Sequence, residues 1–127
     1  MVPEHPPERL FANEAFEIEQ SGPIIMARLR QPEITHLRMQ ELVDECLQRT
    51  RYHNARHVIM DMAVVEFIAS ACLGPMVAML QDLEHIRGRV ALIRCQDNVQ
   101  FLFRVTRLDS AIGLYDDEAE AREHFHA

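Results

Sequence analysis

The chain has 127 residues, of which 48% are hydrophobic, so it is large enough for one domain with its own core. Thirteen basic against twenty acidic residues give a formal net charge of −7, a field that repels a phosphate backbone and argues against a nucleic-acid partner. The sequence contains no apolar run of the roughly 20 residues that a membrane helix needs, so no membrane insertion is expected.

The N-terminal part of the chain predicts a leader followed by a β-hairpin. Residues 1–14 are rich in proline and charge, which is typical of a poorly ordered segment, and we place the domain at residues 15–127. Two short extended runs within residues 16–30 flank the turn signal SGP at 21–23. In the second run apolar residues alternate with others, so one face of that strand is expected to be buried.

A helix is predicted after the hairpin. Pro32 ends the second strand, and a helical period runs from Thr35, the predicted N-cap, to about Arg51. The residues that recur at this spacing, and that we expect to face the core, are Leu37, Leu42, Val43, Cys46 and Leu47.

The second half of the chain alternates buried strands with helices. Residues 57–68, HVIMDMAVVEFI, form a nearly continuous apolar run that is typical of a strand covered on both faces. The next helix is expected to carry a core stripe that includes Leu73 and Leu80 and to end at Gly88. The remaining predictions are a buried strand at 89–95, a helix at 96–110 with Val99, Leu102 and Val105 toward the core, a short edge strand at 112–117, and a final helix at 117–125.

This order of elements predicts the fold class. Strands that alternate with helices indicate a mainly parallel sheet with right-handed crossovers, and the hairpin adds one antiparallel strand. We therefore expect a single α/β domain with a mixed sheet of four to five strands and about four helices.

The segment FIASACLGPM, residues 67–76, contains one hydroxyl in an apolar run. The G-x-S-x-G pattern of a serine nucleophile is absent around Ser70. The four glycines are too scattered for a phosphate-binding loop or a dinucleotide fingerprint, so no cofactor is expected.

Three residue types invite a catalytic or metal-binding interpretation, and each has a simpler one. His53 and His57 are four residues apart, but a metal site needs three or four convergent ligands, and scattered histidines with no metal site are the favoured reading. Cys72 has apolar neighbours and no obvious base, which favours a small buried residue over a nucleophile. Asp61 follows an apolar strand, where a capping or hydrogen-bonding role is favoured over acid–base catalysis. We expect no enzymatic activity.

The three cysteines also indicate the compartment. Cys46, Cys72 and Cys95 are odd in number and widely spaced, and no C-x-x-C pair is present. The N-terminus lacks the layout of a secretory signal, so we expect a cytoplasmic protein with reduced thiols.

Beside its core stripe, the helix after Ser70 has a second apolar flank. Cys72, Met79 and Ile86 lie about 100° from the stripe at roughly 3.6 residues per turn. Such a wide apolar arc indicates either deep burial, which we favour, or a surface offered to a partner.

Residues 57–110 contain Asp61 in a hydrophobic strand, the segment Phe67-Ile-x-Ser-x-x-Leu-Gly74, an amphipathic helix, and Thr106-x-Leu108 before a short strand. This pattern resembles a STAS domain, the family of bacterial anti-sigma-factor antagonists. The hairpin and the first helix fit the opening elements of the family too, so the resemblance covers about residues 15–127. In that family the usual segment is Asp-Ser-Ser-Gly, and its first serine is phosphorylated by a partner kinase that is also the anti-sigma factor. Ser70 matches this serine, whereas Ala69, Ala71 and Cys72 replace the other three residues.

The resemblance implies a non-enzymatic signalling module that regulates transcription in bacteria by binding a kinase-like anti-sigma factor or another regulatory protein. Ser70 is the implied phosphorylation site, and the implied partner-binding residues are Phe67, Ala69, Ser70, Cys72, Leu73, Met76 and Met79. The alternative is a STAS scaffold or transport-complex subunit without a phosphorylation switch. The partner, the pathway and the oligomeric state stay open. The helix begins at Ser70 or Pro75, and Pro75 favours a distorted or delayed start because proline lacks an N–H group.

Overall fold

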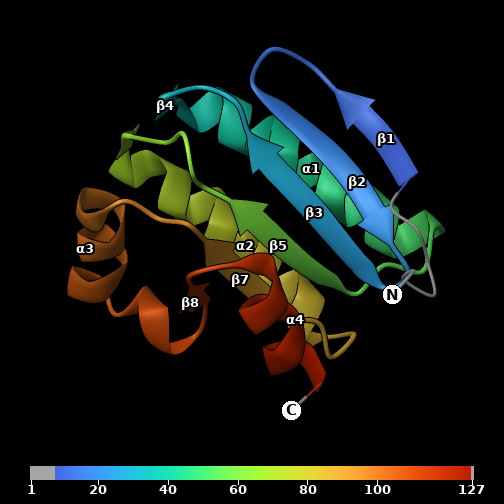
Figure 1. The fold of residues 1–127 in the computed structure, drawn as a ribbon. Helices are drawn as coiled ribbons and strands as arrows, with labels where there is room; N and C mark the ends of the chain where they lie inside the picture. The colour runs from blue at the N-terminus through green and yellow to red at the C-terminus, as the bar shows by residue number, and fades with distance from the viewer. Residues whose placement is uncertain (1–7, 127) are drawn as a thin grey trace.

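A six-stranded mixed sheet with helices on both faces organises the protein (Figure 1). The computed structural model describes residues 8–126. The strands of this part of the chain are β1 Glu8–Ala12, β2 Phe16–Ser21, β3 Ile24–Leu29, β4 Glu33–Ile34, β5 His57–Asp61, β6 Phe67–Ile68, β7 Val90–Ile93 and β8 Gly113–Tyr115. The α-helices are α1 His36–Tyr52, α2 Leu73–Glu84, α3 Asp97–Val105 and α4 Glu118–His126, and two 3₁₀ turns cover Ser70–Cys72 and Leu108–Ser110.

The sheet has the order β1-β2-β3-β5-β7-β8. Strand β2 is antiparallel to both of its neighbours, β1 and β3, and β3, β5, β7 and β8 are parallel. The predicted α/β class with its antiparallel hairpin and mainly parallel sheet is confirmed. The sheet has more strands than the four to five expected, because β1 adds an edge strand that the sequence analysis did not anticipate.

Strand β1 lies within the segment predicted to be a poorly ordered leader, and for residues 8–12 that prediction is wrong. These residues pair with β2 through a register shift between Arg9 and Phe11, and the ring of Phe11 stacks on Phe16 at 5.5 Å between centroids. The charge and short length of this strand, which are typical of sheet edges, hid it in the sequence. The remainder of the predicted leader, residues 1–7, lies outside the described residues.

The hairpin and the first helix follow the local signals closely. Strand β2 ends at Ser21 and β3 begins at Ile24, with Gly22 in the left-handed region at φ 58°. The Thr35 hydroxyl accepts a hydrogen bond from the Arg38 N–H at 3.2 Å, so the predicted N-cap is confirmed. Leu37 was expected in the core, but its side chain is exposed.

The apolar run at 57–68 is two strands in different sheets and not one. Strand β5 stops at Asp61, whose Oδ1 accepts the N–H of Ala63 at 3.1 Å, and a turn then leads to β6. Strand β6 pairs with β4 in a separate two-stranded sheet. The single-strand prediction is therefore wrong, because a side-chain hydrogen bond ends the strand where hydrophobicity alone continues it.

Gly88 has a different role from the predicted helix terminator. Helix α2 ends at Glu84, and the residue in the left-handed conformation beyond it is Arg87, at φ 60°. The Gly88 N–H donates to the Leu83 carbonyl oxygen at 2.7 Å. A Cβ on Gly88 would lie 2.1 Å from the Arg56 carbonyl oxygen, so glycine is required for close backbone packing.

The two faces of the sheet are covered unequally. One face packs under α1 and α2 and carries the main core, which includes Ile18, Ile25, Val58, Leu92 and Met76. On the other face α4 covers a smaller cluster around Ile59 and Ile93, in front of the sheet in Figure 1. The part of this second face on β1, β2 and β3 carries charged side chains. Helix α3 lies at the side of the molecule, and its Val105 is exposed, contrary to the core position expected for it.

Candidate functional site

The segment around Ser70 forms a short surface loop between β6 and α2. Ile68 anchors one end of the loop, because it is buried and lies in β6 beside β4. Ala69 is extended, with φ −67° and ψ 141°, and the Cys72 N–H then donates to its carbonyl oxygen at 2.9 Å. Ser70 opens the 3₁₀ turn and is exposed. The hydroxyl of this loop is therefore accessible from solvent.

Helix α2 has the distorted start that Pro75 indicated. A 3₁₀ turn at Ser70–Cys72 precedes the α-helix, which begins at Leu73, so the boundary lies between the two alternatives. Pro75 occupies the third helical position. The first N–H groups of a helix have no acceptor within the helix, so the missing N–H of this proline costs little there.

Cys72 is a core residue and not a nucleophile held at the surface. Its side chain is buried, and its Sγ donates to the Ile34 carbonyl oxygen at 3.3 Å. Burial raises the pKa of the Cys72 thiol, and the Ala69 backbone offsets this only in part. Burial also raises the pKa of Cys46 and of Cys95 to about 12. These thiols are therefore protonated near neutral pH and poorly suited to nucleophilic attack.

The residues predicted to bind a partner divide into two groups. Phe67 and Ser70 are exposed, and Ala69 and Leu73 are half-buried. Cys72, Met76 and Met79 are fully buried in the core, so their side chains are not available on the surface of this chain. The part of the predicted surface that remains accessible is therefore the loop with Phe67 before it and Leu73, the first residue of α2, after it. Burial of Cys72 and Met79 also supports the favoured reading of the second flank of α2, on which only Ile86 is exposed.

An apolar groove beside the loop was missed by the sequence analysis. It has a volume of about 220 Å³ and lies between β6 and α3; its lining consists of Phe67, Ile68, Asn98, Val99, Phe101, Leu102 and Val105. The signal in the sequence is the run from Val99 to Val105, in which five of seven residues are apolar. That is more than one face of a helix can bury, and the excess is exposed at Phe101 and Val105.

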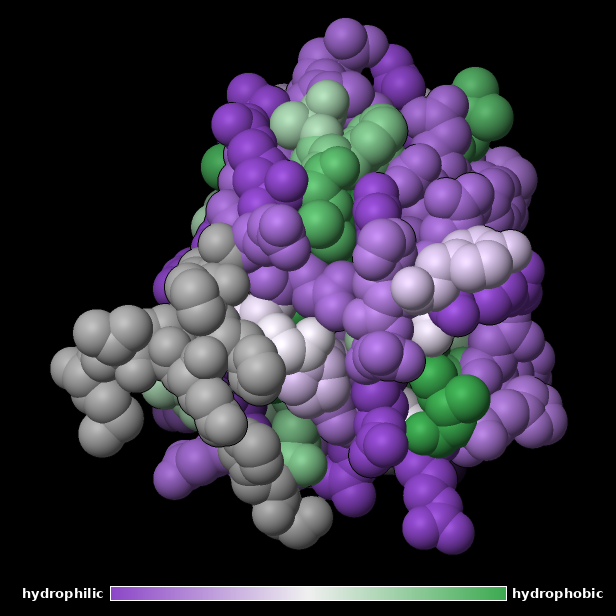
Figure 2. Space-filling model, turned by 90° about the vertical axis from the view of Figure 1, so that its right-hand side faces the viewer, coloured by the Kyte–Doolittle hydropathy of each residue, from purple (hydrophilic) through white to green (hydrophobic). Residues whose placement is uncertain are grey.

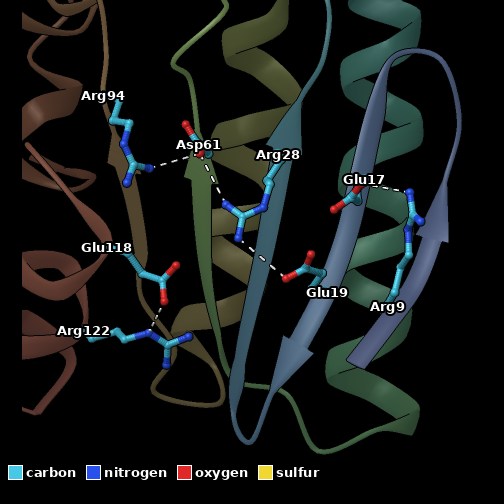
Figure 3. Close-up of polar contacts among 8 residues, drawn as sticks. All are labelled: Arg9, Glu17, Glu19, Arg28, Asp61, Arg94, Glu118 and Arg122. Carbon is cyan, nitrogen blue, oxygen red and sulfur yellow. Dashed lines mark hydrogen bonds and ion pairs between the residues drawn. The ribbon is translucent and has the colours of Figure 1, made fainter. Parts of the chain in front are cut away.

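Asp61 has the hydrogen-bonding role favoured from its place in the sequence. Besides capping the turn that follows β5, it accepts from Arg28 at 3.4 Å and from Arg94 at 3.1 Å. Figure 3 shows these ion pairs within a row of alternating charges that crosses the open face of the sheet. Asp61 thus connects β5 to Arg28 of β3 and to Arg94 after β7, which is a structural role.

His57, one of the histidines that invited a metal hypothesis, is held by contacts within the domain. Among residues 8–126, no group of three or more histidine, cysteine, aspartate or glutamate side chains is arranged to hold a metal ion. His57 has a structural contact, since its Nδ1 accepts from the Arg89 N–H at 3.0 Å and its ring stacks on Phe125. Over the same residues, no helix is both long and apolar enough to span a membrane.

The side of the molecule that carries β1 and α1 has a different character from the groove. In Figure 2 this side is mainly hydrophilic, and its hydrophobic areas are small and separated by polar residues. Exposed apolar residues that are scattered singly are ordinary on protein surfaces, whereas adjacent ones indicate an interaction site. The neighbouring Phe67, Phe101 and Val105 therefore mark the region beside Ser70 as the candidate binding site.

The sequence and the fold are similar to those of known proteins. A family model described as the STAS domain matches residues 15–121. No curated protein sequence matches the chain. Among solved structures, an anti-sigma-factor antagonist (STAS) domain protein from Planctomyces limnophilus aligns with a TM-score of 0.75 at 16% identity, over 90% of this chain and 99% of that one.

Two further structures have the same fold. The phosphorylated form of the Bacillus cell-fate determinant SpoIIAA aligns with a TM-score of 0.69 at 19% identity, over 87% of this chain and 98% of that one. The murine Solute Carrier 26 family member A9 anion transporter aligns with a TM-score of 0.64 at 10% identity, over 98% of this chain and 23% of the transporter. At these identities the similarity concerns the fold, which serves both signalling proteins and transporters.

Proposed function

The chain belongs to the STAS domain family, whose model covers residues 15–121, and from this membership we propose that it is a non-enzymatic, cytoplasmic protein-binding module of the anti-sigma-factor-antagonist type. Its partner is a kinase-like anti-sigma factor or another regulatory protein, and docking uses the Ser70 loop and the first turn of α2. The observation that carries the proposal is the exposed Ser70 hydroxyl, at the position of the phosphorylated serine of the family and beside the exposed Phe67.

Phosphorylation of Ser70 would act as the switch. A phosphate adds a charge of about −1.5 to −2 at neutral pH, and this charge must lose water when an apolar partner surface covers it. A penalty of only about 2.8 kcal/mol weakens binding roughly a hundredfold. The start of α2 favours negative charge through its free N–H groups, so the folded domain tolerates the phosphate. The switch therefore changes docking without unfolding the domain.

Substitutions at Ser70 test this proposal. The probe is the kinase-like protein that is encoded in the same genome as this chain. In calorimetry, Ser70→Asp is expected to bind this protein more weakly than the wild type does, and Ser70→Ala is expected to bind it like the wild type. Gln48→Glu, on the exposed surface near the C-terminal end of α1, adds a negative charge elsewhere and serves as the control. Equal binding by the two Ser70 variants would eliminate the switch.

A second candidate function is a STAS scaffold or transport-complex subunit that binds constitutively. It is motivated by Ala69, Ala71 and Cys72, which replace three of the four residues of the family's phosphorylated segment. Incubation with the kinase-like partner and ATP, followed by intact-mass measurement, separates the two functions. A phosphate located on Ser70 contradicts the constitutive scaffold, and an unmodified chain supports it.

A further inference from the structure

We propose that the groove between β6 and α3 receives one large apolar side chain of the protein partner, and that this anchor stands next to lysine or arginine residues. The inference rests on the proposed function, because it names the partner chemistry at the surface that Ser70 shares. Phe67 joins the two parts of that surface, since it precedes the Ser70 loop and also lines the groove.

The shape of the groove fits a side chain and not a small molecule. Its rim is formed by Phe67, Phe101 and Val105, with exposed fractions of 54%, 64% and 56%, and the buried Ile68 and Val99 lie beneath. The volume of about 220 Å³ is below the roughly 300–1,000 Å³ of small-molecule sites. A pocket of this size with an aromatic rim is typical of the anchor residues that dominate protein–protein interfaces.

Helix α3 has two apolar stripes, and only one of them packs against the domain, so the rim of the groove is not covered. Val99 and Phe103 are fully buried and attach the helix to the domain. Phe101 and Val105, four residues apart, form a second apolar stripe on a neighbouring face, and the polar Asn98 lies three residues before Phe101 on the same face. Within residues 8–126 the exposed apolar surface of Phe101 and Val105 is left to solvent.

The charges around the groove define what stands next to the anchor. Glu33 is paired with Phe67 across the β4–β6 ladder, and Glu66 precedes Phe67 in the chain. The Glu66 carbonyl oxygen accepts a hydrogen bond from the Asn98 side-chain amide, which places this residue at the start of α3, where Asp97 also lies. In the described part of the chain none of these three exposed carboxylates forms an ion pair.

Three carboxylates without ion pairs at one end of an apolar groove favour a cationic neighbour for the anchor. The net charge of −7 acts in the same direction, because it steers basic partners toward the domain and repels acidic ones. It also disfavours a second copy of this chain as the occupant. Arg104 lies near the opposite end of α3, so we expect the basic residues of the partner on the side of Glu33, Glu66 and Asp97.

Selection from a phage-displayed library of random 16-residue peptides on the immobilised full chain tests this assignment. The expected consensus is a phenylalanine, leucine, methionine or tryptophan with lysine or arginine within four positions. The synthetic consensus peptide is expected to lose at least tenfold in affinity for Phe101→Gln. For the double variant Glu66→Gln/Asp97→Asn, the loss is a few-fold and disappears at high salt. Tyr52→Gln, which alters an exposed aromatic residue at the end of α1, is the matched control and should bind normally.

Several outcomes would overturn the proposal. They are the absence of an enriched consensus, a consensus with acidic flanks, and equal binding by Phe101→Gln and the wild type. A dimer at micromolar concentration that Phe101→Gln dissociates would assign the groove to a second copy of the chain. Phe101 is exposed, so the variant is expected to fold, and circular dichroism checks this.

The test also separates the groove from the switch. Ser70→Asp should leave the affinity of the isolated peptide within about twofold, because the peptide fills the groove alone, while the same substitution weakens docking of the full partner. If peptide binding depends on Phe101 and docking of the full partner does not depend on Ser70, the groove assignment stands and the switch is rejected. If peptide binding does not depend on Phe101 and docking of the full partner does depend on Ser70, only the groove assignment is rejected.

Discussion

Gly88 offers the sharpest test of how α2 is attached to the sheet. In Gly88→Ala the new Cβ would lie 2.1 Å from the Arg56 carbonyl oxygen and 3.1 Å from the Leu83 Cβ, whereas ordinary contact begins at 3.4 Å. The obstruction is backbone, which cannot rotate away as a side chain can. The segment that enters β5 must therefore move by about 1.3 Å relative to the end of α2.

The size of the effect follows from what this movement disturbs. The N–H groups of Arg56 and His57 both donate to the Pro23 carbonyl oxygen, at 2.7 and 3.0 Å, and so connect β5 to the hairpin turn. Each such bond contributes about 0.5–1.5 kcal/mol. Overpacking adds about 1–3 kcal/mol. We expect Gly88→Ala to lower the free energy of unfolding by about 2–4 kcal/mol, measured by urea denaturation followed by circular dichroism.

Gly74 provides the matched control. It lies in the first turn of α2, and a Cβ there would meet no heavy atom within 4 Å. Gly74→Ala should therefore raise stability, by up to about 0.5–1 kcal/mol, because alanine loses less backbone entropy in a helix than glycine. If the two alanine variants have the same unfolding free energy, the close approach of Gly88 to Arg56 is not present in solution.

Two further predictions concern titratable groups. Burial, with a smaller contribution from the Glu17 side chain, raises the pKa of Glu19 above its ordinary value of 4.5. The stability that Glu19 contributes is therefore present below pH 4.5 and is lost as the pH rises through its folded pKa. Glu19→Gln should consequently raise the melting temperature at pH 7 and have a vanishing effect below about pH 4; a lower melting temperature at pH 7 would refute this. The raised pKa values of Cys46, Cys72 and Cys95 predict slow alkylation by iodoacetamide at pH 8 and three rapid adducts in urea, counted by intact mass; fast labelling of Cys72 in the folded protein would reopen a nucleophilic role.

Elements whose ends carry local signals could be predicted from the sequence. The SGP turn defined the hairpin, and the Thr35 cap defined the start of α1, because both signals act through hydrogen bonds or backbone angles within a few residues. The Ser70 segment was recognised through the order of its residue types, and the family model covers residues 15–121.

Features that depend on long-range packing could not be predicted in the same way. Strand β1 exists because β2 offers it an edge, and residues 8–12 alone carry little strand signal. The end of β5 depends on the Asp61 side chain, in a stretch whose hydrophobicity continues unbroken to Ile68. Leu37 and Val105 fall at helical core spacing and are nevertheless exposed, since the period defines a face but not whether anything covers it.

The two helices beside Ser70 show why this last distinction matters for function. Both helices have a second apolar stripe, and the spacing of apolar residues in the sequence does not show whether such a stripe is buried or exposed. In α2 the stripe residues Cys72 and Met79 are buried in the core between the sheet and α1, so only Ile86, at the C-terminal end of that stripe, reaches the surface. Helix α3 lies at the side of the sheet, and its second stripe keeps Phe101 and Val105 exposed next to Phe67.

An exposed apolar groove increases the tendency to aggregate, and no packing requirement of the described domain explains it. Its position beside the one exposed hydroxyl of the loop suits a regulated binding site. A phosphate on Ser70 would lie at the edge of an apolar contact, where desolvation of a charge costs the most free energy. The groove would then provide affinity and Ser70 its control. This division of roles predicts that substitutions in the groove and at Ser70 are non-additive in partner binding, as is usual for residues that share one interface.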